Sequence, residues 1–159
     1  KTYADIYPRL ILEKQKILHI ACHGVIDWGK KQKSGLLFDY KSILTPDKLS
    51  NLEFMPDFVF LNCCYSGYLS NSMKNQFAAN VGITLIESGV KAVIVGAWKI
   101  NDSLAMKFAQ YFYNSFLQGS HFGDAVRNAR ERLYNESNGN NTWAAYQCYG
   151  NQLLNICTL

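Results

Sequence analysis

The 159-residue sequence lacks several features that mark other classes of protein. It has no apolar run long enough to span a membrane and no amino-terminal signal pattern, so we expect a cytoplasmic protein with no membrane partner. Its five cysteines are an odd number, and most of them fall in predicted strands. This favours a reducing compartment over a disulfide-linked secreted domain.

The chain also has little concentrated charge. The net charge is +4, and the one short basic run, Lys30, Lys31 and Lys33, is typical of a solvated loop. Because no long basic stripe is interleaved with aromatic residues, we expect no direct nucleic-acid partner. A hydrophobic content of 48% fits one domain over residues 1–159. The first residue is not Met, so we expect this domain to be the catalytic part of a longer chain.

Two segments carry the strongest functional signal. ILHIACHG at 17–24 and FVFLNCCYSG at 58–67 are apolar runs that stop at reactive residues, His23 and Cys64. Runs of this kind predict strands that are buried on both faces of a parallel sheet. Ligands bind at the carboxyl edge of such sheets, so an imidazole and a thiol just past two strand ends can meet there. The pattern predicts a hydrolase with a cysteine nucleophile.

The rest of the sequence predicts an alternation of helices and strands. An apolar stripe between residues 104 and 116 predicts a helix packed on the core, while Arg127, Arg130 and Arg132 predict a solvated helix face. This order indicates a layered α/β sandwich. The predicted helices cover residues 3–12, 46–52, 76–88, 101–117 and 123–136, and the further strands cover 35–40, 91–98 and 143–150.

Six motifs in order resemble the CHAT domain of the caspase-like cysteine protease clan. They are HIACHG, LNCCYSG, GVKAVIVGAW, FYNSFLQG, DAVRNAR and NTWAAYQCYG. The resemblance implies a caspase-like three-layer α/β/α sandwich with a mostly parallel central sheet. It also implies a cysteine endopeptidase that cleaves specific protein substrates. Glutamine-amidotransferase-like thiol hydrolases are disfavoured, because in them the histidine usually follows the cysteine.

The resemblance assigns catalytic roles that agree with the chemistry of the residues. Cys64 is the expected nucleophile, and His23 is the expected general base toward the thiol and general acid toward the leaving amine. The backbone N–H groups of Gly24 and Cys64 are the expected oxyanion hole. A glycine suits this role because a residue without a side chain lets the substrate carbonyl approach the backbone.

Neighbouring residues offer alternatives to these assignments. Cys63 precedes Cys64 on a strand and faces the opposite side of the sheet, so we expect it to be a buried apolar residue. His19 is an alternative base, but burial in the sheet is the expectation. A metal site at His19, Cys22 and His23 is disfavoured, since Cys22 faces away and no distant CxxC or HxxxH motif adds ligands. We expect no metal and no cofactor.

The substrate pocket is predicted from departures from relatives. Asn62 stands where metacaspase-type members carry an Asp, and Met106 stands near the acid of separase-type members. The residue before the scissile bond is therefore expected to be neutral or apolar. Asp102, Asp27 and Asp39 are candidates to orient the imidazole or shape the pocket. Asp102 ranks first, although capping its own helix is the simpler role.

The resemblance further implies a regulated prokaryotic protease. The expected partners are a protein substrate and a sensor or repeat domain, in cis or in trans, within a signalling or antiviral defence system. The alternative is a catalytically silent scaffold that keeps the caspase-like fold. Retention of His23, Gly24 and Cys64 together argues against it. The lysine-rich segment at 30–33 is an exposed place for a cut, but we expect no obligatory self-processing.

Overall fold

Six strands form one mixed sheet in the computed structural model, which describes residues 3–28, 33–39, 42–66 and 71–158. Within these ranges the side chains of residues 26–28, 33, 39, 64–66 and 71 are not described. The elements are α1 (Tyr3–Leu12), β1 (Ile17–Trp28), β2 (Lys33–Asp39), β3 (Ser42–Leu44), α2 (Pro46–Ser50), β4 (Phe58–Ser66), α3 (Asn71–Glu87), β5 (Ala92–Gly96), α4 (Asp102–Phe116), α5 (Phe122–Glu136), η1 (Thr142–Ala144), β6 (Tyr146–Gly150) and η2 (Ile156–Thr158).

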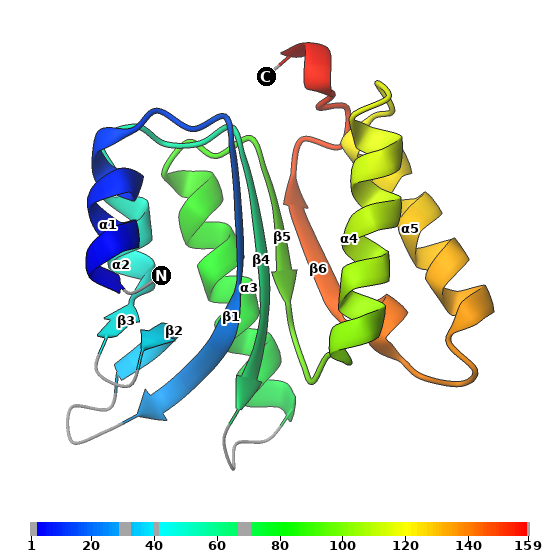
Figure 1. Ribbon diagram of the computed structural model, residues 1–159, viewed down its shortest axis with the longest axis horizontal. Helices are drawn as coiled ribbons and strands as arrows, with labels where there is room; N and C mark the ends of the chain where they lie inside the picture. Colours follow the sequence, from blue (N-terminus) through cyan, green and yellow to red (C-terminus); the bar gives the residue numbers. More distant parts are fainter. Residues whose placement is uncertain (1–2, 29–32, 40–41, 67–70, 159) are drawn as a thin grey trace.

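The sheet has the strand order β3-β2-β1-β4-β5-β6. Its centre is parallel, because β1 pairs with β4 and β4 with β5 in parallel, while β2 and β6 run antiparallel to their neighbours. Since β3 is antiparallel to β2, it shares the direction of the central strands. Figure 1 shows α1, α2 and α3 on one face of the sheet, and α4 and α5 on the other. The predicted three-layer α/β/α sandwich with a mostly parallel sheet is confirmed.

Apolar residues of both alternating sets bury β4 and β5 on both faces, as predicted. The same prediction is wrong for β1, because Leu18 and Ile20 are buried on one face while His19, Ala21 and His23 are exposed on the other. On β4, Val59, Leu61 and Cys63 join the core beneath α1 and α3. Phe58 and Phe60 join the core beneath α4 and α5. All of these side chains have 0% exposure. A strand with two apolar faces requires a helical layer on each side, so the pattern of residues fixes the layers.

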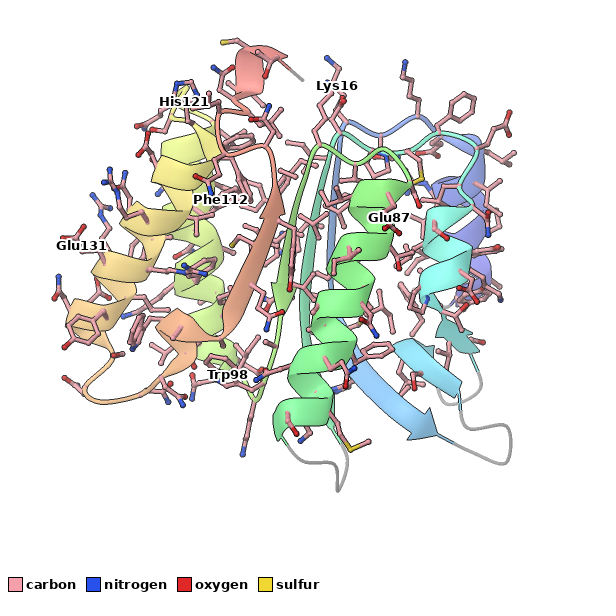
Figure 2. All side chains as sticks on the ribbon, turned by 180° about the vertical axis from the view of Figure 1, so that it is seen from behind. Lys16, Glu87, Trp98, Phe112, His121 and Glu131 are labelled. Atoms are coloured by element: carbon pink, nitrogen blue, oxygen red, sulfur yellow. The ribbon has the colours of Figure 1, made fainter. Side chains whose placement is uncertain are left out.

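The second helical layer rests on an aromatic core. Phe108, Phe112 and Phe116 of α4 are fully buried, and the ring of Phe112 lies 5.4 Å from that of Phe58. The predicted stripe is therefore core. Figure 2 shows Phe112 on the sheet side of the layer, whereas the exposed Glu131 lies on the outer side of α5. Within the described residues, every helix is too short or too polar to traverse a lipid bilayer.

Two strands run further than the sequence predicts. The prediction that each catalytic strand stops at its reactive residue is wrong, because β1 continues to Trp28 and β4 to Ser66. The physical reason is the hairpin with β2. This strand pairs with β1 from His23 to Trp28 and so supplies the ladder partners of the extended part of β1. Helix α3 also begins earlier than predicted, at Asn71. Ser72 and Met73 in this turn are exposed, so no buried apolar residue marks the start of the helix in the sequence.

The end of the chain shows one further difference. The last strand begins at Tyr146 instead of residue 143, because residues 142–144 form a 3₁₀ turn that ends where Ala97 N–H donates to Ala145 O.

The prediction that Arg130 is solvated is wrong. Its guanidinium donates to the carbonyl oxygen of Tyr146 and lies 3.8 Å from the sulfur of Cys148, which ties α5 to β6.

Candidate active site

His23 and Cys64 are direct neighbours in the central sheet. The two residues are register partners in the parallel β1–β4 ladder, where adjacent strands lie about 4.8 Å apart. Register partners occupy the same face of a sheet, and here it is the face covered by α4. The imidazole of His23 is exposed on this face, while the side chain of Cys64 lies outside the described residues. The backbone thus brings the two predicted catalytic positions together.

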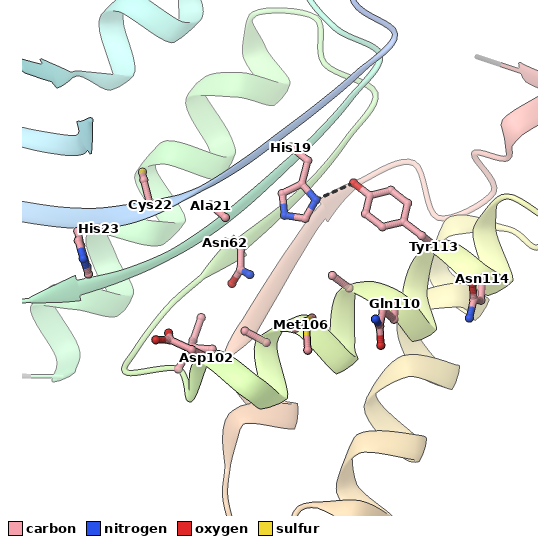
Figure 3. A pocket seen from close by; sticks show the side chains of 13 residues that line it. His19, Ala21, Cys22, His23, Asn62, Asp102, Met106, Gln110, Tyr113 and Asn114 are labelled. Carbon is pink, nitrogen blue, oxygen red and sulfur yellow. Dashed lines mark hydrogen bonds between the residues drawn. The ribbon is translucent and has the colours of Figure 1, made fainter. Parts of the chain in front are cut away.

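A cavity of about 680 Å³ opens beside this pair, between the sheet and α4. Beside it, β4 pairs with β5 only from Phe58 to Leu61, whereas its pairing with β1 continues to Ser66. Figure 3 shows His23 at one end of the cavity, Asn62 near its middle and His19 with Tyr113 at the other end. The lining residues are His19, Ala21, Cys22, His23, Asn62, Ile100, Asp102, Ala105, Met106, Ala109, Gln110, Tyr113 and Asn114.

The three predicted pocket residues all line this cavity. Asn62 projects from β4, and its Oδ1 accepts a hydrogen bond of 3.0 Å from the hydroxyl of Tyr146. Met106 is 60% exposed on α4. Asp102 is exposed at the first turn of the same helix. The structure therefore places all three on the same cavity as His23, and their roles toward a substrate remain predictions.

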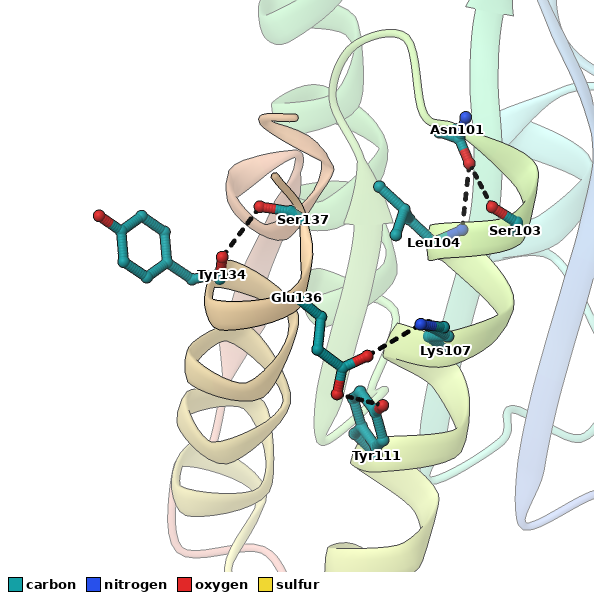
Figure 4. Close-up of polar contacts among 8 residues, drawn as sticks. All are labelled: Asn101, Ser103, Leu104, Lys107, Tyr111, Tyr134, Glu136 and Ser137. Carbon is teal, nitrogen blue, oxygen red and sulfur yellow. Dashed lines mark hydrogen bonds and ion pairs between the residues drawn. The ribbon is translucent and has the colours of Figure 1, made fainter. Parts of the chain in front are cut away.

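Asp102 does not cap its helix. The cap is Asn101, whose Oδ1 accepts hydrogen bonds from the backbone N–H of Leu104 at 3.2 Å and from the hydroxyl of Ser103 at 2.7 Å (Figure 4). The carboxylate of Asp102 is thereby left at the cavity wall. The side chains of the two other acidic candidates, Asp27 and Asp39, lie outside the described residues, as does the lysine-rich segment at 30–32.

Gly24 lies inside β1 and not in a turn beyond it. It has a ladder partner on each side, Leu36 in β2 and Tyr65 in β4. An oxyanion hole needs an N–H that points at the substrate. The role of Gly24 in an oxyanion hole stays a prediction.

The opposite face of the same strands carries two thiols. Cys22 and Cys63 are register partners whose sulfur atoms lie 3.4 Å apart, and Cys63 has 0% exposure. This confirms that Cys63 is a buried residue of the core. The hydrogen bond from Cys63 lowers the pKa of Cys22 below its usual range. Figure 3 shows Cys22 on the other side of β1 from His23.

The sequence did not predict the position of His19 on the cavity wall. We expected burial in the sheet, but the imidazole is exposed on the cavity wall, where it stacks on Phe60 with ring centres 4.4 Å apart. Its Nδ1 lies 3.2 Å from the hydroxyl of Tyr113. Partial burial lowers the pKa of His19 and raises that of Tyr113, so both groups are neutral near pH 7. The available signal was the period of two, since His19 and His23 share a face.

The comparison with protein families matches this arrangement. A family model described as the CHAT domain matches residues 9–151. The chain belongs to the CHAT domain family. This family is related to the caspase-like proteases, and the match includes both central strands and the helix that form the candidate site of this CHAT domain. No curated protein matches the chain.

Proposed function

We propose that this CHAT domain is a cysteine endopeptidase that uses a His23–Cys64 dyad. The observation that carries the proposal is the direct register pairing of these two residues at one end of a cavity of about 680 Å³. A nucleophile and its base must lie within hydrogen-bonding reach, and neighbouring positions on one face of adjacent strands meet that requirement.

The proposed reaction has two stages. His23 takes the proton of the Cys64 thiol, and the sulfur attacks the peptide carbonyl carbon to form a tetrahedral oxyanion. The C–N bond then breaks as His23 gives its proton to the leaving amine, which leaves a thioester on Cys64. In the second stage His23 deprotonates a water molecule that hydrolyses the thioester and regenerates the thiol.

Backbone N–H groups of Gly24 and Cys64 stabilise the oxyanion in this proposal. Gly24 has ladder partners in both β2 and β4, and in this proposal its N–H turns toward the substrate when part of this pairing opens. A requirement of this kind fits a protease that rests inactive until a sensor or repeat domain acts on it. We place the enzyme in a regulated prokaryotic signalling or defence system with one or a few protein substrates.

The residue before the scissile bond is neutral or apolar in this proposal. A pocket for Arg or Lys needs a carboxylate in its interior, and Asn62 and Met106 occupy the positions where relatives carry one. Asp102 is exposed at the first turn of α4, where water weakens its attraction for a cation.

A catalytically silent scaffold is the competing function. A pure interaction module has no need for an open cavity beside a paired histidine and cysteine. The cavity wall carries polar groups that point into open space, which supports a site for a substrate.

Labelling of the full-length protein, with its activator supplied, tests the proposal. The probe is a peptidyl acyloxymethyl ketone, and the variants are Cys64→Ala, His23→Ala, Cys63→Ala and Cys22→Ala. We expect labelling at residue 64 that is lost in the first two variants and kept in the last two. The Cys22 variant is needed because that thiol has a lowered pKa and partial exposure. Labelling of Cys64 no faster than of the exposed Cys157 favours the scaffold.

A further inference from the structure

We propose that the cavity selects a glutamine side chain immediately before the scissile bond, with Asn62 and His19 as the specificity-determining residues. The inference rests on the proposed protease function and narrows its neutral substrate class to a side-chain carboxamide. Two tyrosine hydroxyls orient Asn62 and His19 so that both present N–H donors to the cavity.

The first donor is the amide of Asn62. Because the hydroxyl of Tyr146 donates to Oδ1 at 3.0 Å, the Nδ2 hydrogens of Asn62 are the groups left for a ligand. Tyr146 is held firmly, since it is 1% exposed and stacks on Phe108 with ring centres 4.0 Å apart. Figure 3 shows the Asn62 side chain directed into the cavity, toward α4.

The second donor is the imidazole of His19. Nδ1 of His19 lies 3.2 Å from the hydroxyl of Tyr113. In this proposal the phenol donates to Nδ1, and the hydrogen of the neutral imidazole then lies on Nε2. Phe60 and Tyr113 stack on the ring at centre distances of 4.4 and 5.6 Å and fix its plane. No partner for Nε2 is found among the described residues, so its N–H is available to a ligand.

Two neutral donors on one wall require an acceptor in the substrate. Among the described residues that line the cavity there is no Arg or Lys, so a carboxylate there has no cation to pair with, and Asp102 repels it. A methionine or leucine side chain leaves both donors without a partner, at a cost in free energy. The neutral oxygen of a carboxamide accepts from N–H donors and introduces no charge, so it is the group that this wall favours.

The position of the donors favours glutamine over asparagine. Asn62 lies two positions before Cys64 on β4, about 7 Å along the strand. His19 on β1 lies opposite Phe60, which is two positions before Asn62. The side chain of the substrate has to reach from the scissile carbonyl at Cys64 toward both donors. Glutamine is one methylene longer than asparagine, so its carboxamide reaches further from the scissile carbonyl toward Asn62 and His19.

The test uses three matched probes that differ only in the residue bearing the reactive ketone, which is glutamine, glutamate or methionine. These side chains have almost the same length. The comparison therefore separates the effect of a neutral hydrogen-bond acceptor on the labelling rate from the effects of charge and of size. With the activated full-length protein, we expect the second-order labelling rate at Cys64 to be at least about tenfold higher for glutamine than for either alternative.

Variants assign the preference to the two donors. Asn62→Asp replaces the donor with a carboxylate of the same shape, and we expect it to lose the glutamine preference and gain reactivity toward a lysine probe. His19→Phe and Tyr113→Phe should each reduce the glutamine to methionine ratio severalfold. Tyr111→Phe is the matched control, because the hydroxyl of Tyr111 on the same helix donates to Glu136 at 2.7 Å, away from the cavity (Figure 4).

The outcomes distinguish the inference from the proposed function. Cys64-dependent labelling in which methionine or glutamate equals glutamine overturns the inference and leaves the protease function standing. A glutamine preference that survives Asn62→Asp also overturns it. If no probe labels Cys64 while the same protein folds and binds its activator, the protease function and the inference fail together.

Discussion

The substitution Gly96→Ala tests whether β5 positions the nucleophile strand. Gly96 ends β5, and a Cβ there would lie 2.7 Å from the carbonyl oxygen of Cys63 and 2.6 Å from Cδ1 of Ile100. The Ile100 side chain can rotate away. The Cys63 carbonyl belongs to the backbone of β4, and it must move by about 0.7 Å to reach an ordinary contact of 3.4 Å. The residue that moves with it is Cys64.

The expected effects on stability and on the site differ in size. Overpacking of this kind costs about 1–3 kcal/mol of unfolding free energy. A shift approaching 1 Å at a reacting group costs up to about 100-fold in rate. Urea unfolding and the rate of probe labelling at Cys64 measure the two effects on the same variant.

Gly139→Ala is the matched control. Gly139 has a φ of 86° and nothing within 4 Å of its Cβ position, so the change costs about 1–2 kcal/mol through backbone strain alone. It should lose similar stability and keep the wild-type labelling rate. If Gly96→Ala loses stability but labels Cys64 as fast as Gly139→Ala, then the Gly96 contact does not position the nucleophile and the reasoning is refuted.

Three further predictions follow from individual contacts. Because burial lowers the pKa of His19, the labelling rate of the glutamate probe should increase relative to that of the glutamine probe only at a pH below the ordinary pKa of histidine, where His19 gains a proton, and His19→Phe should abolish this increase. Phe112→Ala should lower the unfolding free energy by about 3–5 kcal/mol, whereas Leu117→Ala, at the exposed C-cap of the same helix, should change it by about 0.5 kcal/mol or less in urea titrations. Cys63→Ala removes the hydrogen bond that lowers the pKa of Cys22, so alkylation of Cys22 by iodoacetamide should move to higher pH; an unchanged profile contradicts the assigned cause.

Local patterns were sufficient to predict the layers. The run at 58–61 has buried residues on both faces of its strand, so a strand covered on both sides is the consistent structure there. The run at 17–24 is buried on one face only, because Leu18 and Ile20 are buried while His19 and His23 on the other face are exposed. Pro46 at the start of α2 marked a helix terminus correctly, although Thr45 makes no side-chain cap there. Where the signal lies within one element, propensity and periodicity were informative.

Features that depend on distant partners could not be predicted in the same way. The extension of β1 depends on its hairpin with β2. The residues immediately around His23 do not include β2, so they cannot indicate this pairing. The place of His19 on the cavity wall depends on Tyr113, which lies 94 residues away on α4. The half-buried Arg130 has its partners on β6. In each case tertiary pairing overrode the local expectation.

The register of β1 against β4 is the structural condition on which the candidate site depends. Side chains alternate along a strand, so a slip of one residue would exchange the face of every side chain of that strand. Leu18, Ile20 and Cys63 are buried on the core face and oppose such a slip. The same residues that build the core therefore hold His23 beside Cys64. Substitutions on the core face, such as Ile20→Asn, should thus reduce labelling of Cys64 in molecules that remain folded, and normal labelling there would show that the pair is held by other contacts.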